Sequence, residues 1–421
     1  MPGSIGPSGG STGERTSQED TSLTFAVCFT NFGPYHLARL RALAARLAPD
    51  GGRLVAYEVA DREQTYPWSR SRLEEPFTWI TLFPDRELET IEPAACRRAM
   101  VVALDRDSPD ALALVGYARP ESMAAARWAR RRGRPAILMS ESQAVDRPRR
   151  WWKELIKTRR VRQFDAALVG GPSHRDYLVE LGMPPDRIAL GYNAVDNDYF
   201  AARADFWRAS PQGPSGLPGA PFFLTVCRFA PEKNLVRLIR AFARYREQAN
   251  RTTAWDLVLC GDGPRAADVQ DAIARTGFES AIHRPGFLQA DALSRYYAHA
   301  AAFVLPSLSE PWGLVVNEAA ACGLPLLVSS RAGCSGTLVP DPDGTTGGRF
   351  DPLDVEEMTT KLAWMAALDG EDRRAMGLRA AGVVSSWGPD RFARGAMEAL
   401  EFARAAQKHC VHPSLTPTKR R

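Results

Sequence analysis

The sequence predicts an α/β protein with two Rossmann-like domains that face each other across a cleft. Short apolar runs bounded by turn residues alternate with helical patterns, which is typical of βαβ units and parallel sheets. The alternation comes in two series, separated at 204–221 by a segment with four prolines and three glycines. The chain has 421 residues, enough for two ordinary domains that each bury a core.

The first series predicts an N-terminal domain over residues 23–203. Its expected strands are 23–30, 53–59, 111–115, 136–139 and 166–169, with helices at 35–47 and 122–131. The segment 204–221 is expected to be an interdomain linker.

The second series predicts a C-terminal domain over residues 222–388. Its expected strands are 222–227, 255–260, 302–305 and 325–328, and a last helix follows at 389–405. We expect disorder in the leader, 1–22, and in the basic tail, 406–421.

Composition and charge exclude several classes of protein. With 45% apolar and 24% charged residues, the chain has no apolar run of about 18 residues, so no integral membrane protein is expected. Seven dispersed cysteines form no C-x-x-C pair, which favours a reducing cytoplasm. A net charge of +5 is modest and does not indicate nucleic-acid binding.

Positive charge is nevertheless concentrated in one segment. Between Arg147 and Arg162 there are eight basic residues against one acid, Glu154, together with Trp151 and Trp152. This segment is a candidate contact for an anionic membrane surface or an anionic acceptor, and a solvated helix face is the alternative.

Two glutamates eight residues apart, Glu310 and Glu318, lie around the expected start of a helix. Gly313 permits close approach of the backbone, and the first-turn N–H groups of Leu314 and Val315 form an anion site that suits a phosphate. Acids at a helix start are also common for reasons of the helix dipole alone.

Two cations, Arg228 and Lys233, follow the buried strand that ends at Cys227. Open α/β sheets bind ligands at such strand-to-helix crevices, and two positive charges there would stabilise a leaving diphosphate. Two surface cations on a loop are the plain alternative.

The motifs together resemble those of family-4 retaining glycosyltransferases, also called glycosyl transferases group 1. The resemblance rests on R-F-A-P-E-K-N at 228–234, L-C-G-D-G-P at 259–264, P-G-F at 285–287 and S-E-P-W-G-L-V-V-N-E-A at 309–319. Residues 191–200 are similar to the family's interdomain segment. The resemblance weakens in the N-terminal half.

The resemblance implies the GT-B fold, in which a final helix crosses back to the first domain. It implies a nucleoside diphosphate sugar as the donor, no cofactor and no metal, and transfer with retained anomeric configuration to a hydroxyl acceptor, with the leaving diphosphate as the base. The roles it implies are Glu318 at the ribose, Glu310 at the transferred sugar, Arg228 and Lys233 at the diphosphate, and Gly33, Phe287, Gly313, Leu314 and Val315 in donor binding.

The acceptor side departs from the family pattern. A single glycine, Gly33, stands in the first turn where the family often has two, and Ser140-Glu141-Ser142 follows a strand where a histidine is frequent. Glu141 and His36 are therefore candidates for the acceptor side, with a capping role and a surface role as their alternatives.

These observations predict a cytoplasmic hexosyltransferase, peripheral at the inner membrane face, that serves polysaccharide or glycolipid synthesis with a glycan or lipid-linked acceptor. A nucleotide-sugar epimerase and a non-catalytic glycan- or partner-binding protein on the same scaffold remain alternatives. A nicotinamide-dependent oxidoreductase is disfavoured, because the first turn lacks G-x-G-x-x-G.

Overall fold

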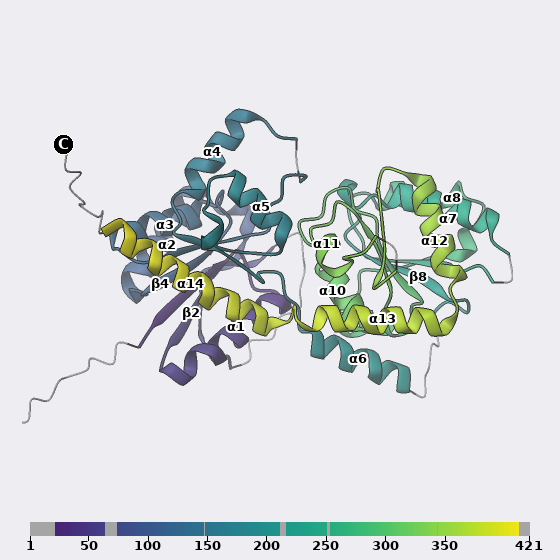
Figure 1. The fold of residues 1–421 in the computed structure, drawn as a ribbon, viewed down its shortest axis with the longest axis horizontal. Coiled ribbons are helices and arrows are strands. Elements are labelled where there is room, and N and C mark those ends of the chain that lie inside the picture. Colours follow the sequence, from purple (N-terminus) through teal and green to yellow (C-terminus); the bar gives the residue numbers. More distant parts are fainter. Residues whose placement is uncertain are drawn as a thin grey trace, which may run out of the picture.

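The computed structural model describes residues 22–63, 74–146, 148–210, 216–250, 253–342 and 344–411. They form two α/β domains that lie side by side, each with a parallel sheet between layers of helices (Figure 1). The predicted fold class is therefore confirmed. The predicted leader, except Ser22, lies outside the described residues.

The N-terminal sheet has seven parallel strands in the order β3-β2-β1-β4-β5-β6-β7. The strands are β1 (Thr24–Phe29), β2 (Arg53–Arg62), β3 (Thr78–Glu87), β4 (Ala111–Val115), β5 (Ala136–Ser140), β6 (Ala166–Val169) and β7 (Ile188–Leu190). The helices are α1 (Pro34–Leu47), α2 (Pro93–Asp107), α3 (Pro120–Arg131), α4 (Trp151–Val161) and α5 (Pro172–Glu180), with 3₁₀ turns η1 (Ala48–Asp50), η2 (Leu88–Thr90) and η3 (Pro185–Arg187).

The C-terminal sheet has six parallel strands in the order β10-β9-β8-β11-β12-β13. The strands are β8 (Phe222–Val226), β9 (Asp256–Cys260), β10 (Ile282–Gly286), β11 (Ala302–Leu305), β12 (Leu326–Ser329) and β13 (Gly347–Phe350). The other elements are α6 (Asn197–Ala209), η4 (Pro231–Lys233), α7 (Leu235–Gln248), α8 (Ala266–Ala274), η5 (Glu279–Ala281), α9 (Ala290–His299), α10 (Leu314–Ala321), α11 (Ser335–Leu338), α12 (Val355–Ala367), α13 (Gly370–Ser385) and α14 (Pro389–Val411).

Each central strand is buried on both faces, as expected for parallel sheets covered by helices. In β1, Phe25 and Val27 face the core beneath α1 and α14, whereas Ala26 and Cys28 face the core beneath α2 and α3. This period of two requires apolar residues at every position, which explains the continuous apolar runs in the sequence.

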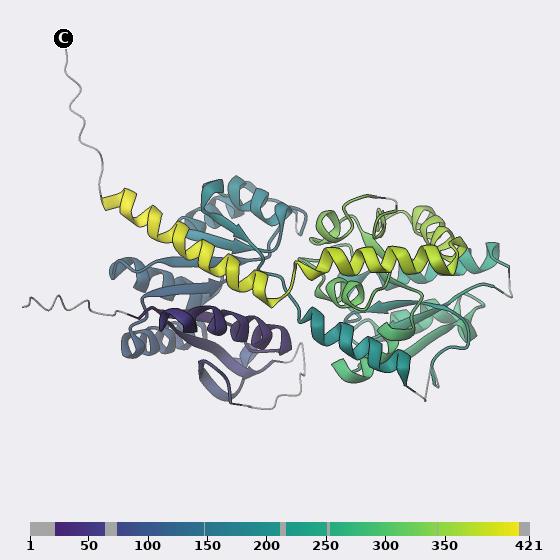
Figure 2. The same cartoon turned by 60° about the horizontal axis from the view of Figure 1, so that its bottom comes forward.

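Two helices cross between the domains. Helix α14 packs on the N-terminal sheet with its apolar side, Phe392, Ala393, Ala396, Ala399, Leu400 and Ala403, so the crossover that the resemblance implied is confirmed (Figure 2). Helix α6 joins the C-terminal core through Phe200 and Ala204. The chain therefore enters the second domain before residue 197.

These two helices extend past two predicted boundaries. The linker was expected from residue 204, but α6 continues to Ala209, because its buried face packs against α9 and α10. Residues 211–215 of the linker lie outside the described residues. The tail was expected from 406, but α14 continues to Val411, and only 412–421 lie outside the described part.

The four strands that the sequence did not predict are β3, β7, β10 and β13, the edges of the two sheets. β3 and β10 contain Pro84 and Pro285, which are typical of edge strands because proline has no N–H to donate. Edge strands lack the continuous apolar run of a central strand, so their sequence signal is weaker.

The structure also describes most of the cysteines and the lengths of the helices. The six cysteines whose side chains are described are free thiols, and all except Cys227 are buried. No helix within the described ranges is long and apolar enough to cross a bilayer.

The crossover helix can be tested at a helical glycine. A Cβ at Gly395 would lie 2.6 Å from the carbonyl oxygen of Leu190 and 2.7 Å from Cδ1 of Leu168. We expect Gly395→Ala to destabilise the protein by about 1–3 kcal/mol in urea unfolding, because the backbone of β7 blocks the added methyl group.

Gly382→Ala, in α13, is the matched control. A Cβ at Gly382 meets nothing within 4 Å, so the change should stabilise by up to about 1 kcal/mol through helix propensity. Equal stabilisation by both variants would contradict the close packing of α14 on the N-terminal domain.

Candidate functional site

The candidate site lies where the strand order of the C-terminal sheet reverses. Strand β8 has β9 on one side and β11 on the other, and ligands of open α/β sheets bind at the carboxyl ends of such strands. Arg228 follows β8, and Glu310 follows β11. The sheet topology thus brings together two motifs about 80 residues apart in the sequence.

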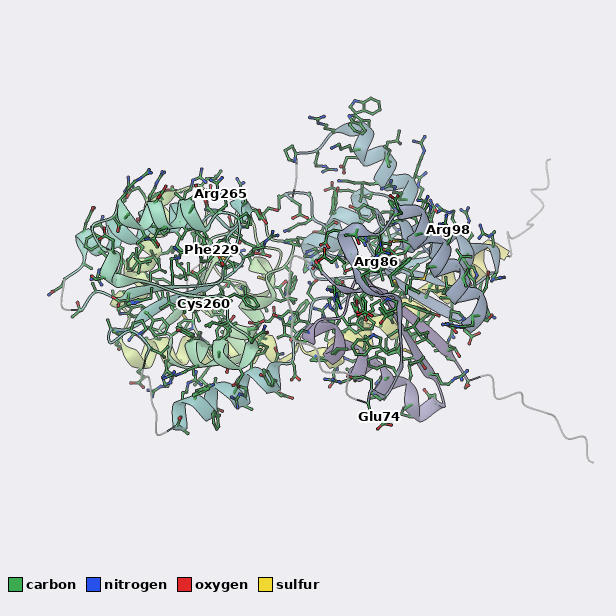
Figure 3. The ribbon with its side chains drawn as sticks, turned by 180° about the vertical axis from the view of Figure 1, so that it is seen from behind. Glu74, Arg86, Arg98, Phe229, Cys260 and Arg265 are labelled. Carbon is green, nitrogen blue, oxygen red and sulfur yellow. The ribbon has the colours of Figure 1, made fainter. Side chains whose placement is uncertain are left out.

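The loop that carries Arg228 is supported by the Gly261-Asp262-Gly263 turn. A Cβ at Gly261 would lie 1.9 Å from the carbonyl oxygen of Cys227, and one at Gly263 would lie 2.7 Å from that of Phe229. Both glycines also have positive φ. Phe229, labelled in Figure 3, is buried, whereas Arg228 is exposed to solvent. The turn therefore holds the backbone and leaves the guanidinium accessible.

Lys233 lies on the 3₁₀ turn η4, two residues before the α-helix that follows it. Helix α7 begins at Leu235, because Asn234 adopts φ +60°. The Asn234 side chain donates to the carbonyls of Pro306 (3.0 Å) and Pro352 (2.7 Å). These bonds tie the Lys233 turn to the segment after β11.

Lys233 and Glu310 form a shielded ion pair. The distance from Nζ to Oε2 is 2.5 Å, and the two side chains are 15% and 10% exposed. Ser307 Oγ donates to the same carboxylate oxygen at 3.0 Å. Lys233 and Glu310 were both predicted as site residues, but the sequence did not indicate their pairing.

Gly313 sets the geometry of the helix start. It adopts φ +99°, and a Cβ there would lie 2.9 Å from Cδ2 of Leu305. Helix α10 begins at the next residue, Leu314, so the first-turn amides of Leu314 and Val315 lack acceptors within the helix. The expected helix start is thus present four residues after Glu310, and its role as an anion site stays a prediction.

Glu318 is buried in α10 between two tyrosines. Tyr297 Oη donates to Oε2 at 2.7 Å, and Tyr35 Oη donates to Oε1. Burial raises the pKa of Glu318 to about 7, against the opposing effect of both hydrogen bonds. Tyr35 belongs to α1, so this carboxylate lies at the domain interface.

The N-terminal domain also contacts the backbone of the segment before α10. Gln143 Nε2 donates to the carbonyl of Glu310 at 2.8 Å. His174 Nδ1 accepts from the N–H of Gly171, so its proton lies on Nε2, which donates to the carbonyl of Pro311 at 2.7 Å. Burial lowers the pKa of His174 and keeps the ring neutral.

In the glycine turn of the N-terminal domain, two backbone N–H groups are hydrogen-bonded to side chains of the same domain. The N–H of Gly33 donates to Nδ1 of His36 at 3.0 Å, and the N–H of Phe32 donates to the buried Glu58 at 2.9 Å. His36 therefore caps α1, a role that the sequence analysis did not give it. The amides of Phe32 and Gly33 already have acceptors within the domain.

On the acceptor side, Glu141 follows β5 and is exposed. Asn193, in the interdomain connection, donates to its carboxylate at 2.8 Å. Phe287 follows β10 and is 44% exposed, at the carboxyl edge of the other sheet. The ligand roles of Gly33, His36, Glu141 and Phe287 stay predictions.

Sequence reasoning missed Tyr35, Gln143, His174, Tyr297 and Ser307. Four of these lie far from the motif at 309–319, and only the fold brings them to it. Ser307 lies three residues before Glu310, where a hydroxyl gives no signal of its own. Within the described ranges, no three His, Cys, Asp or Glu side chains are grouped in a set that could hold a metal ion.

Comparison with known proteins confirms the resemblance drawn from the motifs. Residues 212–382, which contain the ion pair and helix α10, match the family described as glycosyl transferases group 1. The match covers most of the C-terminal domain.

Two relatives illustrate the range of similarity. Sulfoquinovosyl transferase SQD2 of Arabidopsis thaliana is 33% identical over 204 residues, 48% of this chain and 38% of the relative. A GDP-mannose-dependent alpha-(1-6)-phosphatidylinositol monomannoside mannosyltransferase of Mycolicibacterium smegmatis is 30% identical over 195 residues, 45% of this chain and 48% of the relative. The chain spans less than half the length of these two relatives.

Solved structures share the complete two-domain fold. The alpha,alpha-trehalose-phosphate synthase of Burkholderia vietnamiensis matches with a TM-score of 0.70 at 14% identity, over 92% of this chain and 99% of that structure. The Anabaena protein HepE in complex with UDP and glucose matches with a TM-score of 0.68 at 15% identity, over 90% and 99% of the two chains. At these identities the likeness establishes the fold alone.

The raised pKa of Glu318 predicts a pH-dependent stability difference between the wild type and Glu318→Gln. Because the folded-state pKa is above the unfolded value of 4.5, the contribution of Glu318 is fully present below pH 4.5 and is lost as pH rises through about 7. The wild type should lose about 3 kcal/mol relative to Glu318→Gln between pH 4.5 and 8, measured by urea unfolding.

The exposed Glu247→Gln is the control, and its difference from the wild type should not change with pH. A constant difference for Glu318→Gln would show that Glu318 titrates normally in the folded protein.

Proposed function

We propose that this protein is a glycosyltransferase that moves a hexose from a nucleoside diphosphate sugar to a hydroxyl acceptor. The observation that carries the proposal is the arrangement at the switch point between β8 and β11. There an exposed Arg228, the Lys233–Glu310 ion pair and the start of α10 follow the carboxyl ends of two neighbouring parallel strands.

Each part of the proposed donor has a candidate partner in this arrangement, beginning with its phosphates. The amides of Leu314 and Val315 and the dipole of α10 favour a phosphate. Arg228 adds a guanidinium that can bind phosphate oxygens in a bidentate manner. Glu318, four residues into the helix, accepts hydrogen bonds, and the ribose hydroxyls are its proposed donors.

Arg228 and Lys233 are proposed to stabilise the leaving diphosphate. Their positive charges can offset the negative charge that develops as the bond between the anomeric carbon and the diphosphate breaks, so we propose a reaction without a metal. Glu310 holds Lys233 in place in the structure and is proposed to contact the transferred sugar.

The proposed reaction retains the anomeric configuration. The acceptor oxygen forms a bond to the anomeric carbon, the bond from that carbon to the diphosphate breaks, and the acceptor proton passes to the leaving diphosphate. Atoms and charge balance without a protein base. Glu141 is the proposed acceptor-side carboxylate, because it is exposed after β5 and oriented by Asn193.

The relatives suggest a setting for the acceptor. One is named as a phosphatidylinositol monomannoside mannosyltransferase and another as a sulfoquinovosyl transferase. We propose that this protein acts in glycolipid or surface polysaccharide synthesis in the cytoplasm. The expected association with a membrane is a separate proposal, which rests on the surface of α4.

Nucleotide binding is the first test. We expect at least one of the uridine, guanosine and adenosine diphosphates or their sugars to raise Tm, because a ligand at 100 times its Kd stabilises the folded state by about 2.7 kcal/mol. The measurement is a thermal-shift series without added metal. If no nucleotide raised Tm, the donor site would be refuted, and if turnover needed no acceptor, an epimerase would replace the transferase.

The assigned roles predict different defects for different variants. Glu318→Gln should weaken nucleotide binding by about 10- to 100-fold, because the amide is a poorer acceptor for the ribose hydroxyls. Arg228→Ala should instead reduce kcat by about 100-fold or more with a smaller effect on nucleoside affinity. Calorimetric titration and steady-state kinetics measure the two effects.

Arg275→Ala, an exposed arginine of the same domain, is the control for lost positive charge. It should leave both quantities unchanged. The same loss of nucleoside affinity in Glu318→Gln and Arg228→Ala would contradict the division between ribose binding and leaving-group stabilisation.

A further inference from the structure

Helix α4 presents apolar side chains to solvent. It projects from the edge of the N-terminal domain (Figure 1). Trp152, Leu155 and Ile156 are 44%, 44% and 40% exposed, and Trp151, at its first position, is 80% exposed. Positions 152, 155, 156 and 159 recur at helical spacing, so these residues form one continuous face, which we call the outer face of α4.

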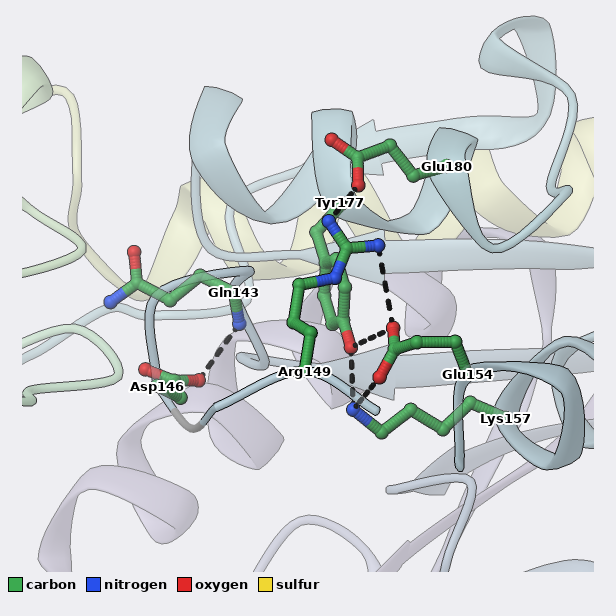
Figure 4. Close-up of polar contacts among 7 residues, drawn as sticks. All are labelled: Gln143, Asp146, Arg149, Glu154, Lys157, Tyr177 and Glu180. Atoms are coloured by element: carbon green, nitrogen blue, oxygen red, sulfur yellow. Dashed lines mark hydrogen bonds and ion pairs between the residues drawn. The ribbon is translucent and has the colours of Figure 1, made fainter. Parts of the chain in front are cut away.

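The inner face of α4 is polar. Glu154 accepts hydrogen bonds from Lys157 Nζ (2.8 Å) and from Tyr177 Oη of α5 (2.9 Å), and Lys157 also donates to Tyr177 Oη at 2.6 Å (Figure 4). Arg149 bridges to Glu180 at 2.6 Å. Only Val161, at the end of the helix, is a buried apolar residue. The usual orientation of an amphipathic helix is therefore reversed.

This network has two consequences for α4. It holds the helix against α5 through hydrogen bonds and ion pairs, so folding does not require burial of the apolar outer face. It also neutralises the one acid of the helix, Glu154, with Lys157 and Arg149. The outer face and its surroundings are left without negative charge from α4.

Positive charge surrounds the apolar outer face. Arg159 belongs to it, Arg160 and Lys153 lie beside it, and Arg150 precedes the helix. None of these four side chains forms an ion pair with a carboxylate in the described part of the chain. Arg147, which the sequence analysis included, lies outside the described residues. An apolar stripe edged by unpaired cations is complementary to an anionic lipid surface, in which aromatic rings enter the headgroup region and cations meet lipid phosphates.

We propose that the outer face of α4 docks on an anionic lipid bilayer. A solvated helix face, the alternative reading of this segment, would expose polar residues at 152, 155 and 156 and bury apolar ones at 154 and 157. The structure has the reverse. The proposal does not depend on the enzymatic activity, because it rests only on the exposed surface.

The docking surface is connected to the candidate site by a short loop. After β5, Gln143 bonds to the carbonyl of Glu310, and the carbonyl of Asp146 accepts from Ser309 Oγ at 3.4 Å. The chain then reaches Arg149 and α4. A protein docked through α4 therefore holds the interface between its domains beside the bilayer.

Vesicle co-sedimentation of the full chain tests the proposal. We expect binding to vesicles of phosphatidylcholine with 25% phosphatidylglycerol, weaker binding at high salt, and little binding to pure phosphatidylcholine. Trp152→Asp with Ile156→Asp, and separately Arg159→Glu with Arg160→Glu, should each weaken binding at least about tenfold.

Two controls match these variants elsewhere on the surface. Leu353→Asp with Leu378→Asp introduces the same two negative charges at leucines that are 46% and 66% exposed, and Arg275→Glu with Arg374→Glu makes the same change of charge as the arginine variant, both on the C-terminal domain. Both controls should bind vesicles like the wild type. Tm and the nucleotide-induced thermal shift should be unchanged in all variants, which separates this proposal from the proposed activity.

Three results would overturn the proposal. The first is no binding of the wild type to anionic vesicles. The second is equal binding by the wild type and the α4 variants. The third is a dimer of the wild type in light scattering that the α4 variants dissociate, because the outer face would then be an interface between two copies of the chain.

Discussion

The hydrogen bonds between the N-terminal domain and the segment before α10 are the constraint on which the site depends. Gln143 and His174 donate to the consecutive carbonyls of Glu310 and Pro311, and Tyr35 donates to Glu318. These three donors come from different elements of one domain, while their acceptors lie on one segment of the other. The segment contains Gly313, whose positive φ directs the chain into α10. The position of α10 is therefore coupled to the distance between the two domains. A ligand that bound between the domains would affect these same three hydrogen bonds.

How far the sequence predicts the fold depends on how each element is buried. Central strands such as β4 and β11 were predicted to the residue, because burial on both faces demands a continuous apolar run. The edge strands β3 and β10 contain proline and bury one face less completely, so they give no comparable pattern. The predicted linker began inside α6, because the attachment of this helix to the second domain depends on tertiary contacts and is not encoded in its own periodicity.

The same distinction holds for the candidate site. Arg228, Lys233, Glu310, Gly313 and Glu318 could be predicted, because each lies in a compact motif whose residue types suggest a phosphate and a sugar. Their partners could not. Tyr297 reaches Glu318 from α9, and Tyr35 and His174 reach the segment from the other domain, as isolated residues with no local pattern. The assignments of single residues had no surrounding motif to support them. One of these residues, His36, caps its own helix.

Lys233 and α4 illustrate two different uses of charge compensation. At the candidate site, Glu310 pairs with Lys233 at low exposure, so this cation is already positioned and partly desolvated before the proposed diphosphate binds. On α4, Glu154 is compensated by Lys157 and Arg149 on the inner face, which leaves the cations of the outer face unopposed. A helix that turns Glu154 and Lys157 toward its own domain and exposes Trp152 and Ile156 departs from the usual amphipathic pattern of a surface helix. Such departures occur where an exposed surface has a partner, and the cations around this one favour the proposed anionic surface over a neutral one.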